Sequence, residues 1–165
     1  MNKNGEVILA SSLASARSIQ ISLESIRLGE AGLTKRRENL LNRVPNEGDY
    51  ASFKKDSITI EDLAYLSAQE GHVFALLRSK SNDILLHGNG TGCTFTDDLE
   101  VLLVQGRMEL VAHSHPDVDH IIPSSEDRDF LKSIGQKKSV IISWYTGRQL
   151  EFYADEFKET EHGYD

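Results

Sequence analysis

Two histidines one residue apart, His113 and His115, stand in the stretch of this sequence that is richest in groups able to do chemistry. They end the segment ELVAHSH, whose composition predicts a β-strand, and a proline follows them. Side chains at positions i and i+2 of a strand point to the same face, about 7 Å apart at the backbone. The two imidazoles can therefore converge on one metal ion.

A metal site needs at least a third ligand, and Asp127 can supply it. The run PSSED at 123–127 predicts a helix that begins near Ser124, and this helix would hold its first-turn carboxylates close to the histidine strand. Two nitrogens and one carboxylate, with a fourth position left for water, form a ligand set typical of catalytic zinc. Water bound in such a site ionises near neutral pH.

Helix capping offers a second explanation for Ser124 and Asp127. A serine hydroxyl at the N-cap accepts a hydrogen bond from the first turn, and an acid there interacts favourably with the helix dipole. Capping alone would account for both residues. It would not account for two histidines on one face at the end of a strand, because packing seldom requires them. The metal site is therefore the favoured interpretation.

The order His-Ser-His-Pro, then a loop, then Pro-Ser-x-x-Asp resembles the JAMM motif of the MPN-plus (Mov34/JAB) metalloproteases. In that family a glutamate precedes His-x-His-Pro and Ser-x-x-Asp. The resemblance covers about residues 58–157 and is specific at 113–127. It implies an MPN/JAB-like fold, a Zn²⁺ ion held by His113, His115 and Asp127, and hydrolysis of a peptide or isopeptide bond in a protein or peptide substrate. Ser124 would stabilise the tetrahedral intermediate.

The spacing of the motif leaves two candidates for the carboxylate ligand. The loop after Pro116 is one residue longer than the commonest family spacing, which would place Glu126 at the ligand position. Asp127 is preferred, because Pro123 and Ser124 then fall in register and loops absorb insertions easily.

The catalytic glutamate of the family sits just ahead of an apolar strand. The nearest acid before VFALL in this sequence is Glu70, which makes Glu70 the candidate general base. A strict alignment on that strand would instead place Val73 where the acid belongs.

The elements around the motif alternate between helix and strand. Thr59 is expected to cap a helix that runs to about Gln69 and stops at Gly71. Turn residues at 79–82 between two apolar runs predict a hairpin. A helix at 97–104, the histidine strand, a helix ending at Gly135 and strands at 138–145 and 149–154 follow. Without a strict βαβ rhythm, this order predicts an α+β fold, a mixed β-sheet flanked by helices.

Residues 1–43 are expected to form an N-terminal helical extension. Apolar residues from Leu9 to Ile26 recur at three- and four-residue steps on one helix face, which either forms a homodimer or covers its own domain. The charge run 35–38 predicts a solvated helix face. Residues 44–56 are expected to be a linker, 57–158 the metal-binding domain and 159–165 a polar tail.

Composition narrows the classes of function. The chain has 165 residues, enough for one domain with a sizeable core, and its net charge of −8 argues against a nucleic-acid binder. No apolar run reaches the length that spans a membrane. A single cysteine, Cys93, provides neither a disulfide nor a cysteine cluster, and the cytoplasm is the expected location.

The leading hypothesis is a zinc-dependent peptidase or isopeptidase in which Glu70 transfers the proton. The alternative is an inactive metal-binding MPN-like module that recognises a protein partner. A zinc deaminase is excluded because its Pro-Cys-x-x-Cys signature is absent. A His-x-His phosphoesterase would need further histidines and acids at other strand ends, and His72, His87 and His120 are scattered. Residues 117–120 are expected to lie in a solvated loop.

Overall fold

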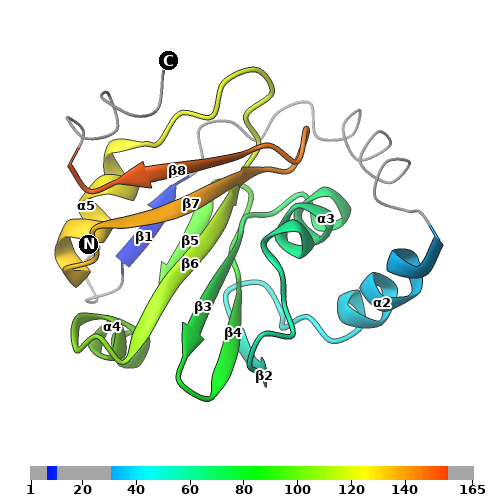
Figure 1. The fold of residues 1–165 in the computed structure, drawn as a ribbon, viewed down its shortest axis with the longest axis horizontal. Coiled ribbons are helices and arrows are strands. Elements are labelled where there is room, and N and C mark those ends of the chain that lie inside the picture. The colour runs from blue at the N-terminus through cyan, green and yellow to red at the C-terminus, as the bar shows by residue number, and fades with distance from the viewer. Residues whose placement is uncertain (1–6, 11–30, 156–165) are drawn as a thin grey trace.

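The computed structural model describes residues 7–10 and 31–155 of the chain. Its centre is a six-stranded mixed sheet in the order β2-β4-β3-β6-β7-β8 (Figure 1). Neighbouring strands are antiparallel except β6 and β7, which are parallel. The strands are β2 (Tyr50–Lys54), β3 (Phe74–Ser79), β4 (Asn82–His87), β6 (Met108–His115), β7 (Lys138–Ser143) and β8 (Gln149–Tyr153). The predicted α+β fold with a mixed sheet is confirmed.

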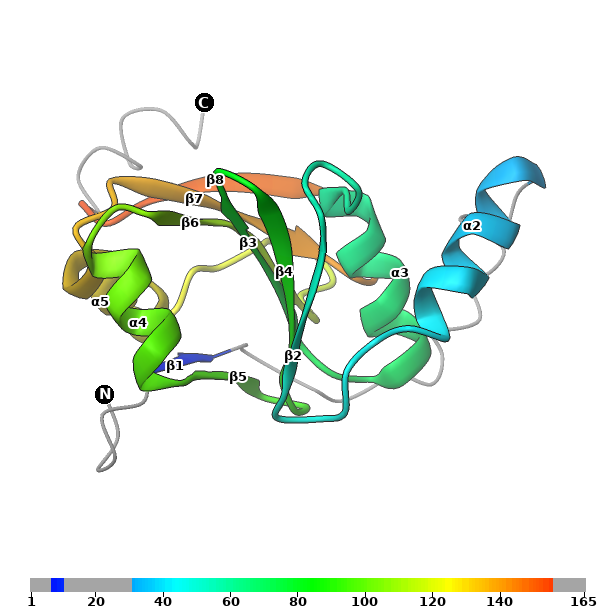
Figure 2. The same ribbon diagram turned by 90° about the horizontal axis from the view of Figure 1, so that it is seen from below.

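Helices lie on both sides of this curved sheet (Figure 2). One side carries α2 (Ala31–Leu41) and α3 (Ile60–Glu70). The other carries α4 (Asp97–Val104), α5 (Ser125–Ile134) and a two-stranded sheet of β1 (Val7–Ala10) and β5 (Gly92–Phe95). No helix in the described part of the chain is long and apolar enough to cross a membrane.

Local signals place α3 where the sequence predicts it. Thr59 Oγ1 accepts a hydrogen bond from the Asp62 amide, and the Asp62 carboxylate accepts one from the Thr59 amide, which completes a capping box. Gly71 ends the helix with φ 72°, a left-handed conformation that glycine adopts without strain. The apolar face of α3 then packs against β3, β6 and β7.

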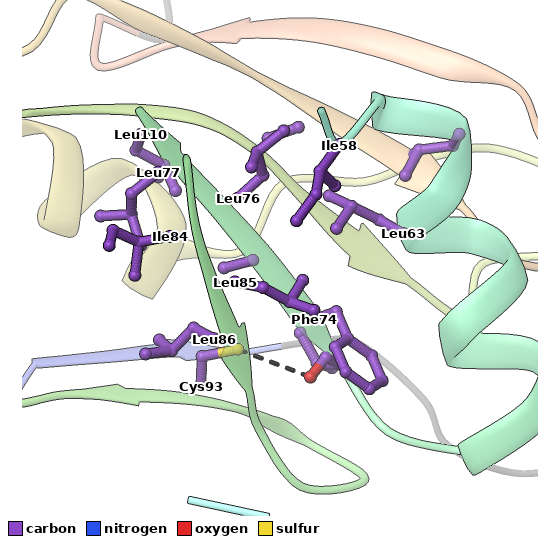
Figure 3. Close-up of a cluster of buried hydrophobic side chains, with 14 of the residues drawn as sticks. Ile58, Leu63, Phe74, Leu76, Leu77, Ile84, Leu85, Leu86, Cys93 and Leu110 are labelled. Carbon is purple, nitrogen blue, oxygen red and sulfur yellow. Dashed lines mark hydrogen bonds between the residues drawn. The ribbon is translucent and has the colours of Figure 1, made fainter. Parts of the chain in front are cut away.

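Buried hydrophobic side chains pack on both faces of the sheet, and Figure 3 shows those around α3, the β3–β4 hairpin and β6. Leu63 of α3 and the strand residues Phe74, Leu76 and Leu85 have no exposed surface. Burial of one such side chain contributes about 1.5–3 kcal/mol, so these residues stabilise β3, the strand that pairs with the histidine strand β6.

Two predictions for the N-terminal half are wrong in part. The predicted helix begins with Leu9. Residues 7–10, which include Leu9, instead form strand β1, and this strand pairs with β5. The rest of that helix, and with it the proposed dimer face, lies outside the described residues. The segment 44–56, predicted to be a linker, contains β2, which pairs with β4 along its whole length. Pairing with a distant strand overrides weak local patterning here.

The charge run at 35–38 lies in α2 but is not simply a solvated face. Arg37 is buried, and its Nε donates to Asp62 Oδ1 at 2.9 Å. Arg36 donates to both carboxylate oxygens of Asp62. Burial opposes the charge on Asp62, but hydrogen bonds from Arg36, the Thr59 amide and Arg37 outweigh it and lower the pKa of the carboxyl. These ion pairs hold α2 against α3.

Replacement of Asp62 tests this contact. We expect Asp62→Ala to lower the free energy of unfolding by about 3–5 kcal/mol, because it removes the carboxylate half of the capping box and leaves the buried Arg37 guanidinium without its carboxylate. The matched control is Glu61→Ala, one residue earlier and exposed, which should change it by less than about 1 kcal/mol. Urea unfolding measures both. A loss below 1 kcal/mol in Asp62→Ala would contradict the assignment.

Candidate metal centre

Strand β6 sets the direction of the two histidines. Ser114, between them, points to the α3 side, where its Oγ lies 2.7 Å from Ser67 Oγ. Because side chains alternate along a strand, His113 and His115 point to the opposite face of the sheet, toward α5. Neither imidazole has exposed surface. The structure thus brings the two rings together on one buried face, as the spacing predicts.

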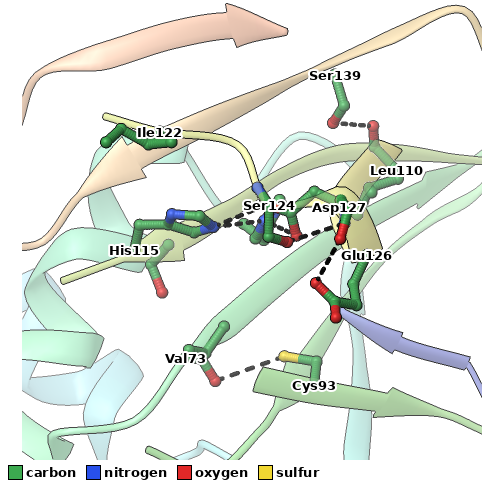
Figure 4. Close-up of polar contacts among 12 residues, drawn as sticks. Val73, Cys93, Leu110, His115, Ile122, Ser124, Glu126, Asp127 and Ser139 are labelled. Atoms are coloured by element: carbon green, nitrogen blue, oxygen red, sulfur yellow. Dashed lines mark hydrogen bonds and ion pairs between the residues drawn. The ribbon is translucent and has the colours of Figure 1, made fainter. Parts of the chain in front are cut away.

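Helix α5 supplies the carboxylate. Ser124 is its N-cap, and its Oγ accepts a hydrogen bond from the Asp127 amide at 3.0 Å. In return, Asp127 Oδ2 accepts one from the Ser124 amide at 3.0 Å (Figure 4). This capping box fixes the Asp127 side chain over the end of β6. Capping and metal binding are therefore compatible uses of the same residue.

Three side chains form a compact triad. His113 Nε2 lies 3.1 Å from Asp127 Oδ1, His115 Nε2 lies 3.0 Å from Asp127 Oδ2, and the two Nε2 atoms are 3.2 Å apart. Ligand atoms around a four-coordinate zinc ion are about 3.3 Å from one another, given metal–ligand distances near 2.0–2.1 Å. Among the described residues, no further His, Cys, Asp or Glu belongs to this group. The triad fits such an ion.

Burial and mutual contact shift the pKa values of the triad. Burial lowers the pKa of His113. Burial also opposes a charge on His115, but hydrogen bonds with Asp117 and Asp127 outweigh it and raise its pKa to about 9. Burial likewise opposes the charge on Asp127, yet the two histidines hold its pKa well below the usual range. Asp127 is therefore ionised and available as a ligand.

A second carboxylate, Asp117, orients His115. Its Oδ2 lies 2.9 Å from His115 Nδ1 and also accepts a hydrogen bond from the Ile122 amide at 3.1 Å. Because its pKa is raised to about 9, the metal-free His115 ring donates from Nδ1 to Asp117 and from Nε2 to Asp127. Once the Nε2 proton leaves, the bond to Asp117 still orients the ring and leaves the Nε2 lone pair free for an ion, an arrangement common for metal-binding histidines. Asp117 is buried, so the expectation that it is solvated is wrong, whereas Asp119 and His120 are exposed as expected.

The His113 ring, unlike that of His115, makes polar contacts through only one of its two nitrogens in the described part of the chain. Its Nδ1 is buried and has no hydrogen-bond partner among residues 7–10 and 31–155, and its ring meets Phe152 edge-on at 5.7 Å between centroids. A buried polar atom without a partner is costly. The Nε2 side alone therefore makes the polar contacts of this ring, which supports a function for that nitrogen.

The structure brings Asp127, and not Glu126, into the triad. Glu126 is exposed, and its Oε1 accepts a hydrogen bond from its neighbour Ser125 at 3.3 Å. The longer loop is absorbed before Ser124, as its position in the capping box indicates. Ser124 itself is half-buried at the edge of the site, with its Oγ used in the cap.

Glu70 does not join the triad. It is the last residue of α3 and lies on the Ser114 side of the sheet, opposite the two metal-site histidines. Its carboxylate is within 4.8 Å of ring nitrogens of His72 and His87. The turn at Gly71 therefore does not carry Glu70 to the His113/His115 face, where a general base for the triad would have to lie.

Val73 and Cys93 are apolar or neutral neighbours of the site. Both are fully buried, and the Cys93 thiol lies 3.6 Å from the Val73 carbonyl oxygen (Figure 4). Burial, and to a smaller degree the charge of Asp127, raise the pKa of the Cys93 thiol. Cys93 is therefore a neutral thiol in the metal-free protein, and its sulfur is not among the ligand atoms that converge in the triad.

Comparison with models of protein families, with curated proteins and with solved structures gives no match for this chain. The candidate site is thus supported by its own geometry.

Zinc titration separates the two carboxylate candidates. We expect Asp127→Ala to lower zinc affinity at least about 100-fold, because it removes one of three ligands from a buried site. Glu126→Ala, one residue earlier and exposed, should leave the affinity unchanged. Equilibrium competition with a chromophoric chelator measures both. The reverse order of effects would show that the helix register is wrong.

The raised pKa of His115 predicts a pH dependence in the metal-free protein. A histidine whose pKa is about 9 when folded, against about 6.5 when unfolded, adds stability below pH 6.5 that is lost as the pH rises through 9. We expect the free energy of unfolding in the presence of chelator to fall by about 2–3 kcal/mol between pH 6.5 and 9. His115→Gln should abolish this slope. A flat or rising profile in the unsubstituted protein would refute the assignment.

Proposed function

We propose that this chain is a JAMM-like zinc-binding protein that holds one Zn²⁺ ion tightly through His113, His115 and Asp127. The observation that carries the proposal is the convergence of two imidazole nitrogens and the two oxygens of one carboxylate, with contacts of 3.0–3.2 Å, among three side chains that have no exposed surface. Two imidazole nitrogens and one carboxylate suit zinc, whereas magnesium and calcium prefer sites made of oxygen ligands.

The surroundings of the triad support the same proposal. Asp117 fixes the orientation of His115, and the Ser124 amide fixes that of Asp127. Such outer hydrogen bonds keep ligands in place before the ion arrives and add to its affinity. The Phe152 ring packs edge-on against His113, and the three triad side chains have no exposed surface. The triad is therefore rigid, and most of the ordering that binding requires is already present.

Two observations favour a non-catalytic zinc centre over a peptidase. All three ligands are fully buried, so a substrate has no exposed approach to them. Glu70, the expected general base, lies with His72 and His87 on the other face. In this proposal the bound ion ties α5 to β6, and the module acts by recognition rather than by hydrolysis.

Zinc-dependent hydrolysis of a peptide or isopeptide bond is the second candidate. The three-ligand set favours it, because a fourth position remains for water, and zinc supplies Lewis-acid activation of that water. Ser124 holds the Asp127 side chain and lies at the edge of the site. A carboxylate other than Glu70 would have to accept the proton.

One set of purified proteins tests both candidates. After dialysis against metal-free buffer, the unsubstituted chain should retain about one zinc ion. We expect Asp117→Asn to weaken zinc binding about 10–100-fold, because His115 Nδ1–H then donates to an uncharged and weaker acceptor. Asp119→Asn, in the same loop but exposed, is the control and should bind like the unsubstituted chain. Retention of no zinc, with uptake of none on titration, would refute the proposed function.

Cleavage assays on the same samples decide between the candidates. Incubation of the zinc-loaded chain with a linear peptide and with an isopeptide-linked ubiquitin-like substrate should yield no product. Cleavage that disappears in Asp127→Ala would instead establish the peptidase.

A further inference from the structure

A second group of metal-binding side chains lies on the opposite face of the sheet from the triad. It consists of Glu70, His72 and His87, each with a ligand atom within 4.8 Å of the others. In the described residues these two groups are the clusters of three or more such side chains. We propose that Glu70, His72 and His87 form a second, exchangeable site for Zn²⁺ or a similar first-row transition ion.

His87 is a preformed ligand. It is the last residue of β4, its residue surface is 4% exposed, and its ring stacks on Phe74 with centroids 4.4 Å apart. Its Nδ1 lies 2.8 Å from the Pro45 carbonyl oxygen. A carbonyl only accepts hydrogen bonds, so Nδ1 carries the proton and Nε2 of the neutral ring presents a lone pair to the cluster. A backbone carbonyl commonly orients a metal-binding histidine in this way.

His72 faces that lone pair from the turn after α3. Its Nδ1 is 2.8 Å from His87 Nε2, and its Nε2 is 3.7 Å from Glu47 Oε1. Glu70 enters from the last turn of α3, and the left-handed Gly71 between them lets the chain reverse so that both side chains reach the cluster. Two nitrogens and a carboxylate thus converge from two elements that the fold holds rigidly.

Without a metal, the short contact between the two rings is a hydrogen bond in which His72 Nδ1–H donates to His87 Nε2. Metal binding replaces it when the His72 proton moves from Nδ1 to Nε2, so that both facing nitrogens become ligands. The proton then points toward Glu47 Oε1, which would orient the ring from outside. No net proton is released from neutral rings.

Exposure distinguishes this site from the triad. The side chain of His72 is 28% exposed and that of Glu47 is 56% exposed, whereas the triad side chains have no exposed surface. An ion can therefore enter and leave without opening the fold. Once bound, it would connect the C-terminal end of α3 to β4 and, through the Pro45 carbonyl, to the segment that leads into β2.

Zinc titration of chelator-stripped protein tests the proposal. We expect the unsubstituted chain to bind two equivalents, one tight and one at least tenfold weaker. His72→Ala and the isosteric Glu70→Gln should remove the weaker equivalent and keep the tight one. Asp127→Asn should remove the tight equivalent and keep the weaker one. His120→Ala removes an exposed histidine outside both groups and should still bind two. Circular dichroism verifies that each variant is folded.

The outcomes separate this inference from the proposed function. A single equivalent that Asp127→Asn removes and His72→Ala leaves intact would overturn the second site and support the triad. A single equivalent that His72→Ala removes would support the second site while refuting the triad. Two equivalents that persist in His72→Ala would also overturn the second site, as would the absence of any zinc binding.

Discussion

The buried carboxylate of Asp127 joins two parts of the fold that the candidate site requires. Oδ2 accepts a hydrogen bond from the Ser124 amide at the start of α5 and also contacts His115 Nε2. Oδ1 contacts His113 Nε2. With no exposed surface, this charge has no water to stabilise it and depends on these neighbours. The position of the helix and the orientation of the two rings are therefore set together, before any metal binds.

Successive side chains of β6 point to opposite faces of the sheet, so the polar side chains of this strand lie on two faces. His113 and His115 point toward α5, and Ser114 between them contacts Ser67 of α3. Glu70 and its two histidines lie on the α3 face, out of the triad. The buried triad and the partly exposed group of Glu70, His72 and His87 therefore lie on opposite sides of the sheet. This division places Glu70 outside the group formed by His113, His115 and Asp127.

Features with local physical causes were predictable from the sequence. The capping boxes at Thr59 and Ser124, the hairpin of β3 and β4 and the facing of His113 and His115 follow from neighbouring residues and the period of the backbone. Strands β1, β2 and β5 were missed because each is defined by a partner distant in sequence. The short run at 92–95 carries too weak a pattern by itself.

Side-chain partners were harder to predict than backbone elements. The charge run at 35–38 predicts a solvated helix face. Only the packing of α2 on α3 shows that Arg37 donates a hydrogen bond to Asp62. Asp117 had one usable signal, its position two residues after His115, because metal-binding histidines commonly donate to a carboxylate. The role of Glu70 depends on which side of the sheet the turn at Gly71 faces, and no local pattern determines that.

Crystallography with anomalous scattering tests the metal centre most directly. Data collected just above and just below the zinc absorption edge from zinc-loaded crystals locate the ion without reference to any assumed ligand. We expect a zinc peak about 2.0–2.2 Å from Nε2 of His113, Nε2 of His115 and a carboxylate oxygen of Asp127. A map without a peak there, in which the three side chains remain hydrogen-bonded to one another, would contradict it.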